Sequence, residues 1–400
     1  MKADVYLDYA AGAPLRPAAL DAYARADVPG NPHALHRPAR RARRALDEAR
    51  EVIAAALGAD PAEVVFTSGG TEADALAVQG LHAARQAPMP RPHLLVGATE
   101  HHAVLDNARL AVRRWGGTAL EIPVDKSGLA DVDFVADHLR RHGAETSLVS
   151  LMAANNETGA LQPVAAVAAL AREHGVPVHS DWAQAVGKLA LDFKASGLAA
   201  ASVSAHKLGG PVGIGALVLG RRLVVEPLAG GGGQERGLRS GTADARGAAA
   251  FAAALREAMA QDPSLLDALL GPLDRLIAAR PELAAVSPPP GEGLPGLRCF
   301  TVAGASGEAL VYLLDQAGLA CSTGSACTAG VAQASHVLLA MGLGSAASSA
   351  VRVSVGHAST PDDVNALVAA LPEAAQRARA AKAAGGVGDA LAAGDTEGGR

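Results

Sequence analysis

The stretch Ser-Val-Ser-Ala-His-Lys-Leu-Gly-Gly, residues 202–210, places a lysine directly after a short apolar run and directly before a glycine loop. Only six of the 35 basic residues are lysines, so a lysine in this setting is unusual for the chain. A lysine that forms a Schiff base must lose its proton, which burial and neighbouring cations favour. On these residues alone, a solvated loop lysine is the simpler interpretation of Lys207.

A second segment, Val-His-Ser-Asp-Trp-Ala-Gln at residues 178–184, places Asp181 just past another candidate strand. A carboxylate there can pair with a pyridinium nitrogen and keep it protonated, which makes the ring an electron sink. The alternative is an N-cap for the following turn, and the local residues fit both interpretations equally well.

A third segment, Val-Val-Phe-Thr-Ser-Gly-Gly-Thr-Glu-Ala-Asp at residues 64–74, runs from a strand through glycines into a helix predicted to open at Thr71. Thr71 and Asp74 have the spacing of a capping box. A helix N-terminus offers N–H groups and a favourable dipole to anions, so the segment is a candidate phosphate site. An ordinary strand-to-helix turn is the simpler interpretation when the segment is taken alone.

Short β-branched runs alternate with Ala/Leu-rich runs along the first 250 residues. Candidate strands are 63–67, 93–97, 147–152, 176–180, 201–204 and 215–219, and candidate helices are 71–85, 103–115, 131–142 and 164–174. This alternation predicts a mostly parallel sheet with helices on both faces. Ligands bind such sheets beyond the carboxyl ends of the strands, which is where the three segments lie.

The pattern changes near residue 250. Helical patterns at 243–259 and 264–279 are followed by a Pro/Gly loop, the runs 298–302, 307–316 and 351–355, and a last helix from Pro361. These runs predict a smaller α/β domain. The predicted division is a large domain at 15–255, a small domain at 1–14 and 256–382, and a disordered tail at 383–400, which is rich in Gly and Ala.

Composition narrows the class of protein. The 400 residues carry a formal net charge of −5, a weak acidic balance that gives no support to nucleic-acid or membrane-surface binding. The three cysteines, Cys299, Cys321 and Cys327, argue against a disulfide framework and for a reducing compartment. The N-terminus has no apolar signal region and no apolar run is long enough to span a bilayer, so we expect a cytoplasmic protein.

Taken together, the motifs resemble the pyridoxal 5'-phosphate (PLP) core of the cysteine desulfurases, within the class V aminotransferase group. Asp-x-x-Gln at 181–184 and Ser-x-His-Lys at 204–207 carry the resemblance first. Further matching segments, in order, are Leu7–Ala11, Gly30–Pro32, Thr99–His101, Asn155–Gly159, Gly231–Thr242 and Ser322–Thr328. Each motif is weak alone, but the whole order, spanning residues 5 to 370, is highly specific. The resemblance implies PLP fold-type I, a large α/β domain with a mostly parallel, helix-flanked sheet plus a smaller α/β domain.

The resemblance also implies roles for single residues. Lys207 would hold PLP covalently, Asp181 would face the pyridine nitrogen, and Gln184 would face the ring hydroxyl. His101 would stack on the ring and help to move protons, where a satisfied loop histidine is the plainer alternative. The implied phosphate ligands are Gly70, Thr71, Ser204, His206 and, from the neighbouring subunit, Thr242, so a homodimer is expected.

The implied substrate ligands are Asn31, Asn155 and Arg352, with Arg352 binding the substrate carboxylate in a bidentate fork. Asn155 would serve either the substrate or the ring oxygen. Cys327 lies among Ser, Thr, Gly and Ala, residues suited to a mobile loop, and in the family such a cysteine attacks the sulfur of cysteine bound to PLP. The other two cysteines fit small core residues, and the cysteine spacing is wrong for a zinc site.

The expected function is therefore removal of sulfur from L-cysteine to give L-alanine and a persulfide on Cys327, by the long-loop (iron–sulfur cluster and nitrogen-fixation) subgroup. A sulfur-acceptor or scaffold protein is the expected partner, and iron–sulfur cluster assembly, tRNA thiolation and cofactor sulfuration all use such donors. The alternatives are a selenocysteine lyase, another PLP-dependent lyase, or a non-catalytic sulfur-carrier scaffold. Two motifs depart from the family pattern: the N-terminal motif at Gly12 and Ala13, and the segment after Lys207 at Gly209 and Val212. These departures concern loop packing and partner contacts and leave the cofactor residues unchanged.

Overall fold

The computed structural model describes residues 4–324 and 334–394, with side-chain surroundings described as far as residue 384. The chain divides into two compact units. The large unit consists of Ala11–Asn156 and Leu161–Pro263, and the small unit of Met1–Ala10, Glu157–Ala160 and Ser264–Arg400. The sequence predicted boundaries at 14/15 and 255/256, and no sequence pattern indicated that Glu157–Ala160 joins the small unit.

A seven-stranded sheet forms the centre of the large unit, in the order β2-β8-β7-β6-β5-β3-β4. Its strands are β2 (Val64–Thr67), β3 (His93–Gly97), β4 (Thr118–Ile122), β5 (Thr146–Ser150), β6 (Val178–Asp181), β7 (Ala200–Ser204) and β8 (Gly215–Leu219). Six of these were predicted from the sequence. The prediction missed β4, an edge strand whose half-exposed residues do not form a continuous apolar run.

Strand direction decides where ligands can bind this sheet. β8 runs antiparallel to β2 and β7, and every other neighbouring pair is parallel. All strands except β8 therefore point their carboxyl ends to one edge of the sheet. At that edge the first residue of β8, Gly215, pairs with both Thr67 and Ser204.

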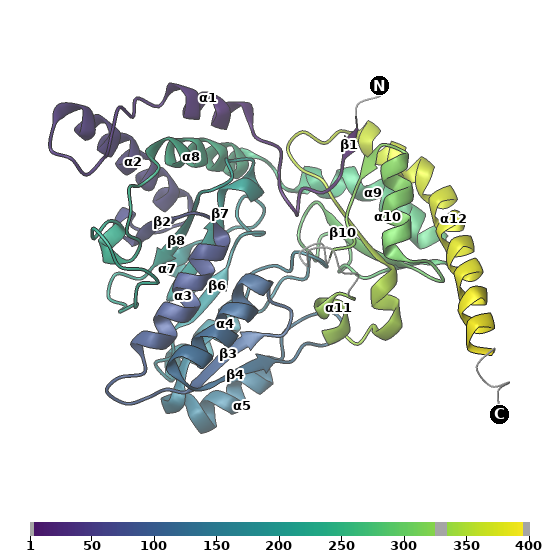
Figure 1. Ribbon diagram of the computed structural model, residues 1–400, viewed down its shortest axis with the longest axis horizontal. Helices are drawn as coiled ribbons and strands as arrows, with labels where there is room; N and C mark the ends of the chain where they lie inside the picture. Colours follow the sequence, from purple (N-terminus) through teal and green to yellow (C-terminus); the bar gives the residue numbers. More distant parts are fainter. Residues whose placement is uncertain (1–3, 325–333, 395–400) are drawn as a thin grey trace. The chain divides into compact units, whose positions relative to one another are not determined.

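Helices cover the sheet because each buries an apolar face. Those of the large unit are α1 (Pro17–Arg25), α2 (Arg37–Ala56), α3 (Gly70–Ala84), α4 (His102–Trp115), α5 (Val132–His142), α6 (Val164–Glu173), α7 (Phe193–Ser196) and α8 (Ala245–Ala260). Figure 1 shows α3 and α4 side by side across the sheet, where they share an apolar core with β2, β3, β5, β7 and β8. Helices α1 and α2 pack on α8, and α5 packs on α6.

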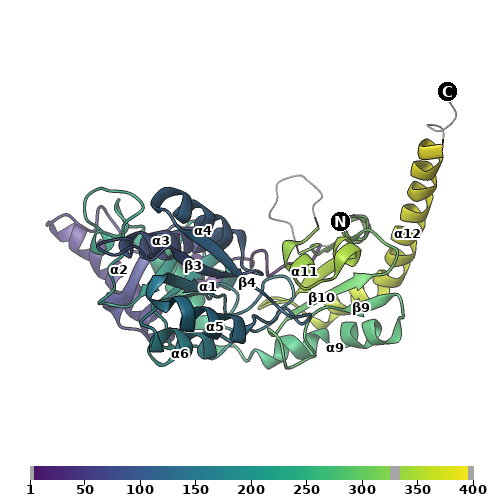
Figure 2. The ribbon, with the colours of Figure 1, turned by 90° about the horizontal axis from the view of Figure 1, so that it is seen from below.

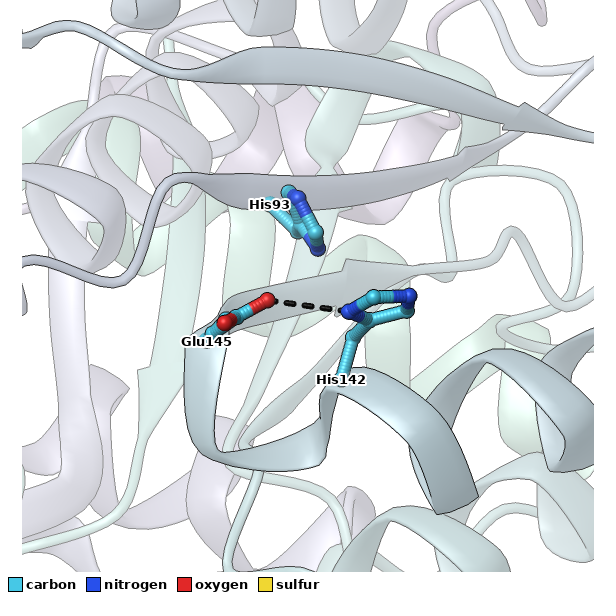
Figure 3. A group of neighbouring side chains, drawn as sticks. All are labelled: His93, His142 and Glu145. Atoms are coloured by element: carbon cyan, nitrogen blue, oxygen red, sulfur yellow. Dashed lines mark hydrogen bonds and ion pairs between the residues drawn. The ribbon is translucent and has the colours of Figure 1, made fainter.

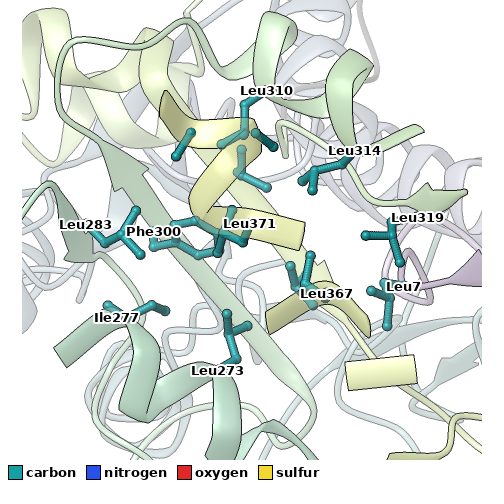
Figure 4. Close-up of a cluster of buried hydrophobic side chains, with 14 of the residues drawn as sticks. Leu7, Leu273, Ile277, Leu283, Phe300, Leu310, Leu314, Leu319, Leu367 and Leu371 are labelled. Carbon is teal, nitrogen blue, oxygen red and sulfur yellow. The ribbon is translucent and has the colours of Figure 1, made fainter. Parts of the chain in front are cut away.

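The small unit has its own core. β10 (Leu297–Val302) lies between β9 (Leu283–Ala285) and β12 (Ala350–Ser354) in an antiparallel sheet, and β1 (Val5–Tyr6) pairs in parallel with β11 (Leu319–Ala320). Its helices are α9 (Ser264–Ala279), α10 (Gly307–Gln316), α11 (His336–Ala340) and α12 (Pro361–Gly394). Leucine side chains from α9, α10 and α12 pack around Phe300, and Leu7 joins them from the N-terminal segment (Figure 4).

The last helix belongs to the small unit. Figure 2 shows α12 as one long helix, and it ends at Gly394, inside the segment 383–400 for which the sequence predicted a disordered tail. Among the described helices, none combines the length and the apolar character needed to cross a membrane.

Short 3₁₀ turns complete the structure: η1 (Pro61–Glu63), η2 (Gly143–Glu145), η3 (Ala205–Leu208), η4 (Glu235–Gly237) and η5 (Gly344–Ser349).

Candidate active site

The carboxyl edge of the large sheet gathers most of the predicted site residues. Nine of them lie at or just after the carboxyl end of a strand: Gly70 and Thr71 after β2, His101 after β3, Asn155 after β5, Asp181 and Gln184 at β6, and Ser204, His206 and Lys207 at β7. Because these strands are parallel to one another, segments separated by more than 130 residues in sequence end at the same edge.

Lys207 lies in η3, the 3₁₀ turn that follows β7. The turn ends at Gly209, whose left-handed conformation (φ 79°) suits glycine. The Lys207 side chain is half-buried, and its Nζ donates a hydrogen bond to the carbonyl oxygen of Ala11 at 2.9 Å. The backbone of residues 11–16 is tied to the same turn, since Ala13 donates to the His206 carbonyl. This partly enclosed, fixed position excludes the interpretation of Lys207 as a freely solvated loop lysine.

Asp181, the last residue of β6, is 8% exposed. Its Oδ1 accepts a hydrogen bond from the Ala183 amide at 2.8 Å, so the carboxylate does cap the following turn. Burial raises the pKa of Asp181, while that bond and the nearby positive charge of Lys207 lower it. The two interpretations of this residue are therefore compatible, because one oxygen caps the turn and the carboxylate still lies within the field of the lysine.

Two further buried acids, Asp74 and Glu100, lie close enough to Asp181 to interact with its charge; the sequence pattern predicted only a helix cap for Asp74 and no role for Glu100. Burial raises the pKa of both carboxyls well above the usual range, and the charge of Asp181 raises them further. Glu100 accepts a hydrogen bond from the Met152 amide. An aspartate inside an otherwise apolar helix, and a glutamate inside the quoted Thr-Glu-His motif, were the available signals.

The buried acids lie beside a buried neutral histidine. His179 is fully buried in β6, with its Nδ1 2.8 Å from Ser150 Oγ and its Nε2 2.8 Å from Ser202 Oγ. Burial lowers the pKa of His179 to about 3, so the ring is uncharged at neutral pH. Asp74 approaches it to 3.6 Å. This polar layer fixes β5, β6 and β7 to one another below the catalytic edge.

The start of α3 forms an open anion cradle. Gly69 is the N-cap residue, and among the described residues no side chain caps this terminus, so the predicted capping box of Thr71 and Asp74 is wrong. Asp74 is instead buried in the helix interior. The first N–H groups of α3 therefore remain available to an anion.

Close backbone packing holds this cradle against β7 and β8. A Cβ on Gly70 would lie 3.3 Å from Cβ of Ser204, and one on Gly215 would lie 2.7 Å from the carbonyl carbon of Gly69. The Nε2 of His206 is buried and makes no hydrogen bond to any described residue. Burial and the charge of Lys207 lower the pKa of His206.

These features fit PLP. The cradle suits the phosphate, the half-buried lysine suits a covalent link to the aldehyde carbon, and the buried Asp181 suits the pyridine nitrogen. The unpartnered His206 nitrogen beside the cradle is a donor or acceptor that a phosphate would satisfy.

His101 and Asn155 are fixed by their own hydrogen bonds. His101 is the N-cap of α4, and its Nδ1 accepts from the Ala103 amide at 3.1 Å. This bond assigns the proton of the neutral ring to Nε2. Asn155 is buried and donates from Nδ2 to the Thr99 carbonyl at 2.9 Å. Gln184 is 7% exposed.

Four predicted residues are not brought to this edge by the described structure. Asn31 and Thr242 are exposed in loops of the large unit. Arg352 lies in β12 of the small unit, 2% exposed, where its Nη2 donates to Asp8 Oδ1 at 2.6 Å. Cys327 lies outside the described residues.

The two described cysteines are poor nucleophiles. Cys299 is buried in β10 and Cys321 follows β11, and burial raises the pKa of each thiol to about 12. A thiol with such a pKa carries almost no thiolate at neutral pH.

Comparison with known proteins agrees with this geometry. Residues 5–367 match the aminotransferase class V family. The chain is 46% identical over 392 residues to the IscS-like cysteine desulfurase of Mycobacterium tuberculosis, covering 95% of this chain and 99% of that protein. Two solved structures are similar. A NifS-like protein from Rickettsia africae has a TM-score of 0.81 and 28% identity over 93% of this chain and 99% of that chain. A structure described as SspA in complex with cysteine has a TM-score of 0.75 and 32% identity over 88% and 98%.

The geometry of the site, with a lysine, an aspartate and an anion cradle at one edge of the sheet, is consistent with these matches. The family model matches most of the chain, and the M. tuberculosis relative is similar over its full length. This chain belongs to the class V aminotransferase family of PLP-dependent enzymes and, within it, to the cysteine desulfurases.

Proposed function

We propose that this cysteine desulfurase transfers the sulfur of L-cysteine to Cys327, which leaves L-alanine and an enzyme persulfide. We choose Cys327 as the sulfur acceptor because the other two thiols of the chain stay protonated. The chain has three cysteines, and burial suppresses the thiolate at both Cys299 and Cys321. The neighbour solved in complex with cysteine supports the choice of substrate.

PLP, when bound, supplies an electron sink for the bonds that break at the substrate. Asp181 would pair with the pyridine nitrogen and favour its protonated form, and the cradle at Gly70 with Ser204 and His206 would hold the phosphate. Lys207 would anchor the cofactor and could hold or release a proton at Nζ. His101, which follows β3 and whose Nε2 carries the ring proton, would transfer a proton to or from the substrate; the Nδ1 hydrogen bond to the Ala103 amide supports this role.

The remaining roles concern substrate and assembly. We assign the substrate carboxylate to Arg352, whose guanidinium has enough N–H donors to keep Asp8 and hold a second carboxylate. Asn31 and Asn155 are assigned to substrate, and Thr242 to the phosphate of a neighbouring subunit in a homodimer. The exposure of Thr242 supports that assignment. A cytoplasmic location and a sulfur-acceptor or scaffold partner complete the proposal.

One set of substitutions tests the persulfide step. Cys327→Ser should keep the yellow colour of the bound cofactor and still bind cysteine, whereas alanine formation should nearly stop. Each ~1.4 kcal/mol of lost barrier stabilisation is tenfold in rate, so the loss of a nucleophile is expected to cost several factors of ten. The matched controls Cys299→Ser and Cys321→Ser should stay active. Alanine and sulfide output in dithiothreitol, with mass spectrometry for the persulfide, measures the effect.

Turnover of cysteine by Cys327→Ser at the wild-type rate would contradict the persulfide mechanism. The selenocysteine lyase reading would then gain support, because selenium can leave without a protein thiol. Borohydride reduction and peptide mapping test the cofactor link separately: the label should appear on Lys207, and Lys207→Ala should abolish it.

A further inference from the structure

A cluster of imidazole and carboxylate groups lies at the amino edge of the large sheet, away from the site described above. His93 is the first residue of β3, His142 is the last residue of α5, and Glu145 is the last residue of η2 (Figure 3). The catalytic segment Thr99–His101 follows the other end of β3. At about 3.3 Å per residue, a five-residue strand separates the two places by roughly 13 Å.

The three side chains approach one another closely. His93, His142 and Glu145 each offer one ligand atom, and all three atoms lie within 4.8 Å of one another. His142 Nδ1 is 2.9 Å from Glu145 Oε2. A third imidazole, that of His138, packs against both histidines, with ring centroids 5.1 Å from His93 and 5.2 Å from His142.

Two nitrogens of this cluster make no hydrogen bond to any described residue. They are Nδ1 of His93 and Nε2 of His138, and both atoms are buried. Buried polar atoms in folded proteins nearly always have a partner, so an exception calls for an unassigned water or ion. The His138 side chain is 9% exposed, which leaves it inside the cluster and not on the surface.

The backbone that carries these ligands is fixed. The Ser147 hydroxyl donates to the His93 carbonyl at 2.8 Å, and the Thr146 hydroxyl donates to the His142 carbonyl at 2.8 Å. The side chains of His142 and Glu145 are 42% and 56% exposed, so they can adjust without disturbing the core. The adjacent cations Arg140 and Arg141 both pair with Asp137, which reduces their repulsion of a metal ion.

We propose that His93, His142 and Glu145 form a binding site for Zn²⁺ or a similar first-row divalent cation, with a fourth position for water or His138. Two imidazoles and a carboxylate are a ligand set that Zn²⁺ takes in proteins, at Zn–N and Zn–O distances of about 2.0–2.2 Å. These distances place two ligands of a tetrahedral ion about 3.3 Å apart. The 2.9 Å pair of His142 and Glu145 must therefore open slightly, and any pair near the 4.8 Å limit must close, by rotation of the side chains. Calcium and magnesium prefer all-oxygen sites and fit this cluster poorly.

Cobalt(II) titration of the full-length, PLP-loaded protein tests the proposal, because Co²⁺ substitutes for Zn²⁺ and its visible spectrum reports the ligands. We expect one equivalent to bind with a d–d spectrum of nitrogen and oxygen ligands and to be displaced by Zn²⁺. His142→Ala should abolish this signal, and Glu145→Gln should weaken binding at least tenfold. The matched controls, His33→Ala and Glu173→Gln at exposed positions outside the cluster, should bind as the wild type does.

The proposal would be overturned by the absence of a cobalt spectrum, by binding only at millimolar concentration as for an adventitious ion, or by a spectrum unchanged in His142→Ala. A thiolate-to-cobalt charge-transfer band as the sole signal would also overturn it, since that band would place the ion on a cysteine. Circular dichroism of each variant checks the fold, and both ligand substitutions are at exposed side chains. The desulfurase activity of His142→Ala should equal that of the wild type, because the cluster lies at the opposite edge from the cofactor residues.

Discussion

Substitution of Gly215 by alanine should damage cofactor binding without touching a single predicted ligand. Gly215 pairs with Thr67 and Ser204, and its missing side chain lets the Gly69 backbone approach β8. A Cβ at this position would lie 2.6 Å from the Val203 carbonyl oxygen and 2.7 Å from the Gly69 carbonyl carbon. Ordinary contact begins at 3.4 Å, so backbone atoms must move by 3.4 − 2.6 = 0.8 Å.

This overpacking should cost about 1–3 kcal/mol of stability. A displaced Gly69–Gly70 segment should also lose one charge-assisted hydrogen bond to the phosphate, which contributes about 1.5–3 kcal/mol, so PLP affinity should fall roughly 10- to 150-fold. Reconstitution of the apoprotein, followed by absorbance and fluorescence, measures the affinity, and urea unfolding measures the stability.

Gly230→Ala is the matched control, since a Cβ there meets no atom within 4 Å, and it should behave as the wild type does. Wild-type cofactor affinity in Gly215→Ala would refute the assignment of the α3 terminus as the phosphate cradle. A loss equal in both variants would refute the packing argument.

Three other perturbations follow from the structure. Arg50→Met should destabilise the large unit by about 3–5 kcal/mol in urea unfolding, because it leaves the buried Glu235 carboxylate without its bidentate partner at 2.7 and 2.8 Å. Adding Glu235→Gln should restore part of this loss, and a double variant with no restoration would contradict the ion-pair explanation. His179→Gln should make the free energy of unfolding less sensitive to acid. The pKa of His179 is about 3 in the folded protein, so below about pH 6.5 only the unfolded chain binds a proton at this residue. The wild type should therefore lose about 2 kcal/mol relative to the variant by pH 5, and parallel curves of stability against pH would disprove this. Thr242→Ala should lower PLP affinity at least tenfold in a dimer by light scattering; a monomer with full cofactor would end the cross-subunit proposal.

Local sequence patterns were enough to predict the fold class, and the resemblance of the ordered motifs to the cysteine desulfurases predicted the cofactor chemistry. Strand and helix periodicity is a local property, so β3, β8, α9 and α10 were predicted with the bounds that the structure has. The motifs around Asp181 and Lys207 are likewise contiguous, and parallel strands bring their carboxyl ends together without further information. The role of Cys327 stays a prediction of the sequence, because that residue lies outside the described part of the chain.

Tertiary structure alone decided the features that depend on contacts between distant segments. Asp74 has the spacing of a cap in sequence, yet the packing of α3 against the sheet buries it beside Asp181 and His179. Glu235 pairs with Arg50 across 185 residues, and Arg352 with Asp8 across 344. His93 meets His142 only because β3 pairs with β5, the strand that follows Glu145. A one-dimensional pattern carries the type of each element, but burial and charge pairing belong to the assembled unit, where desolvation raises the pKa of Asp74 and lowers that of His179.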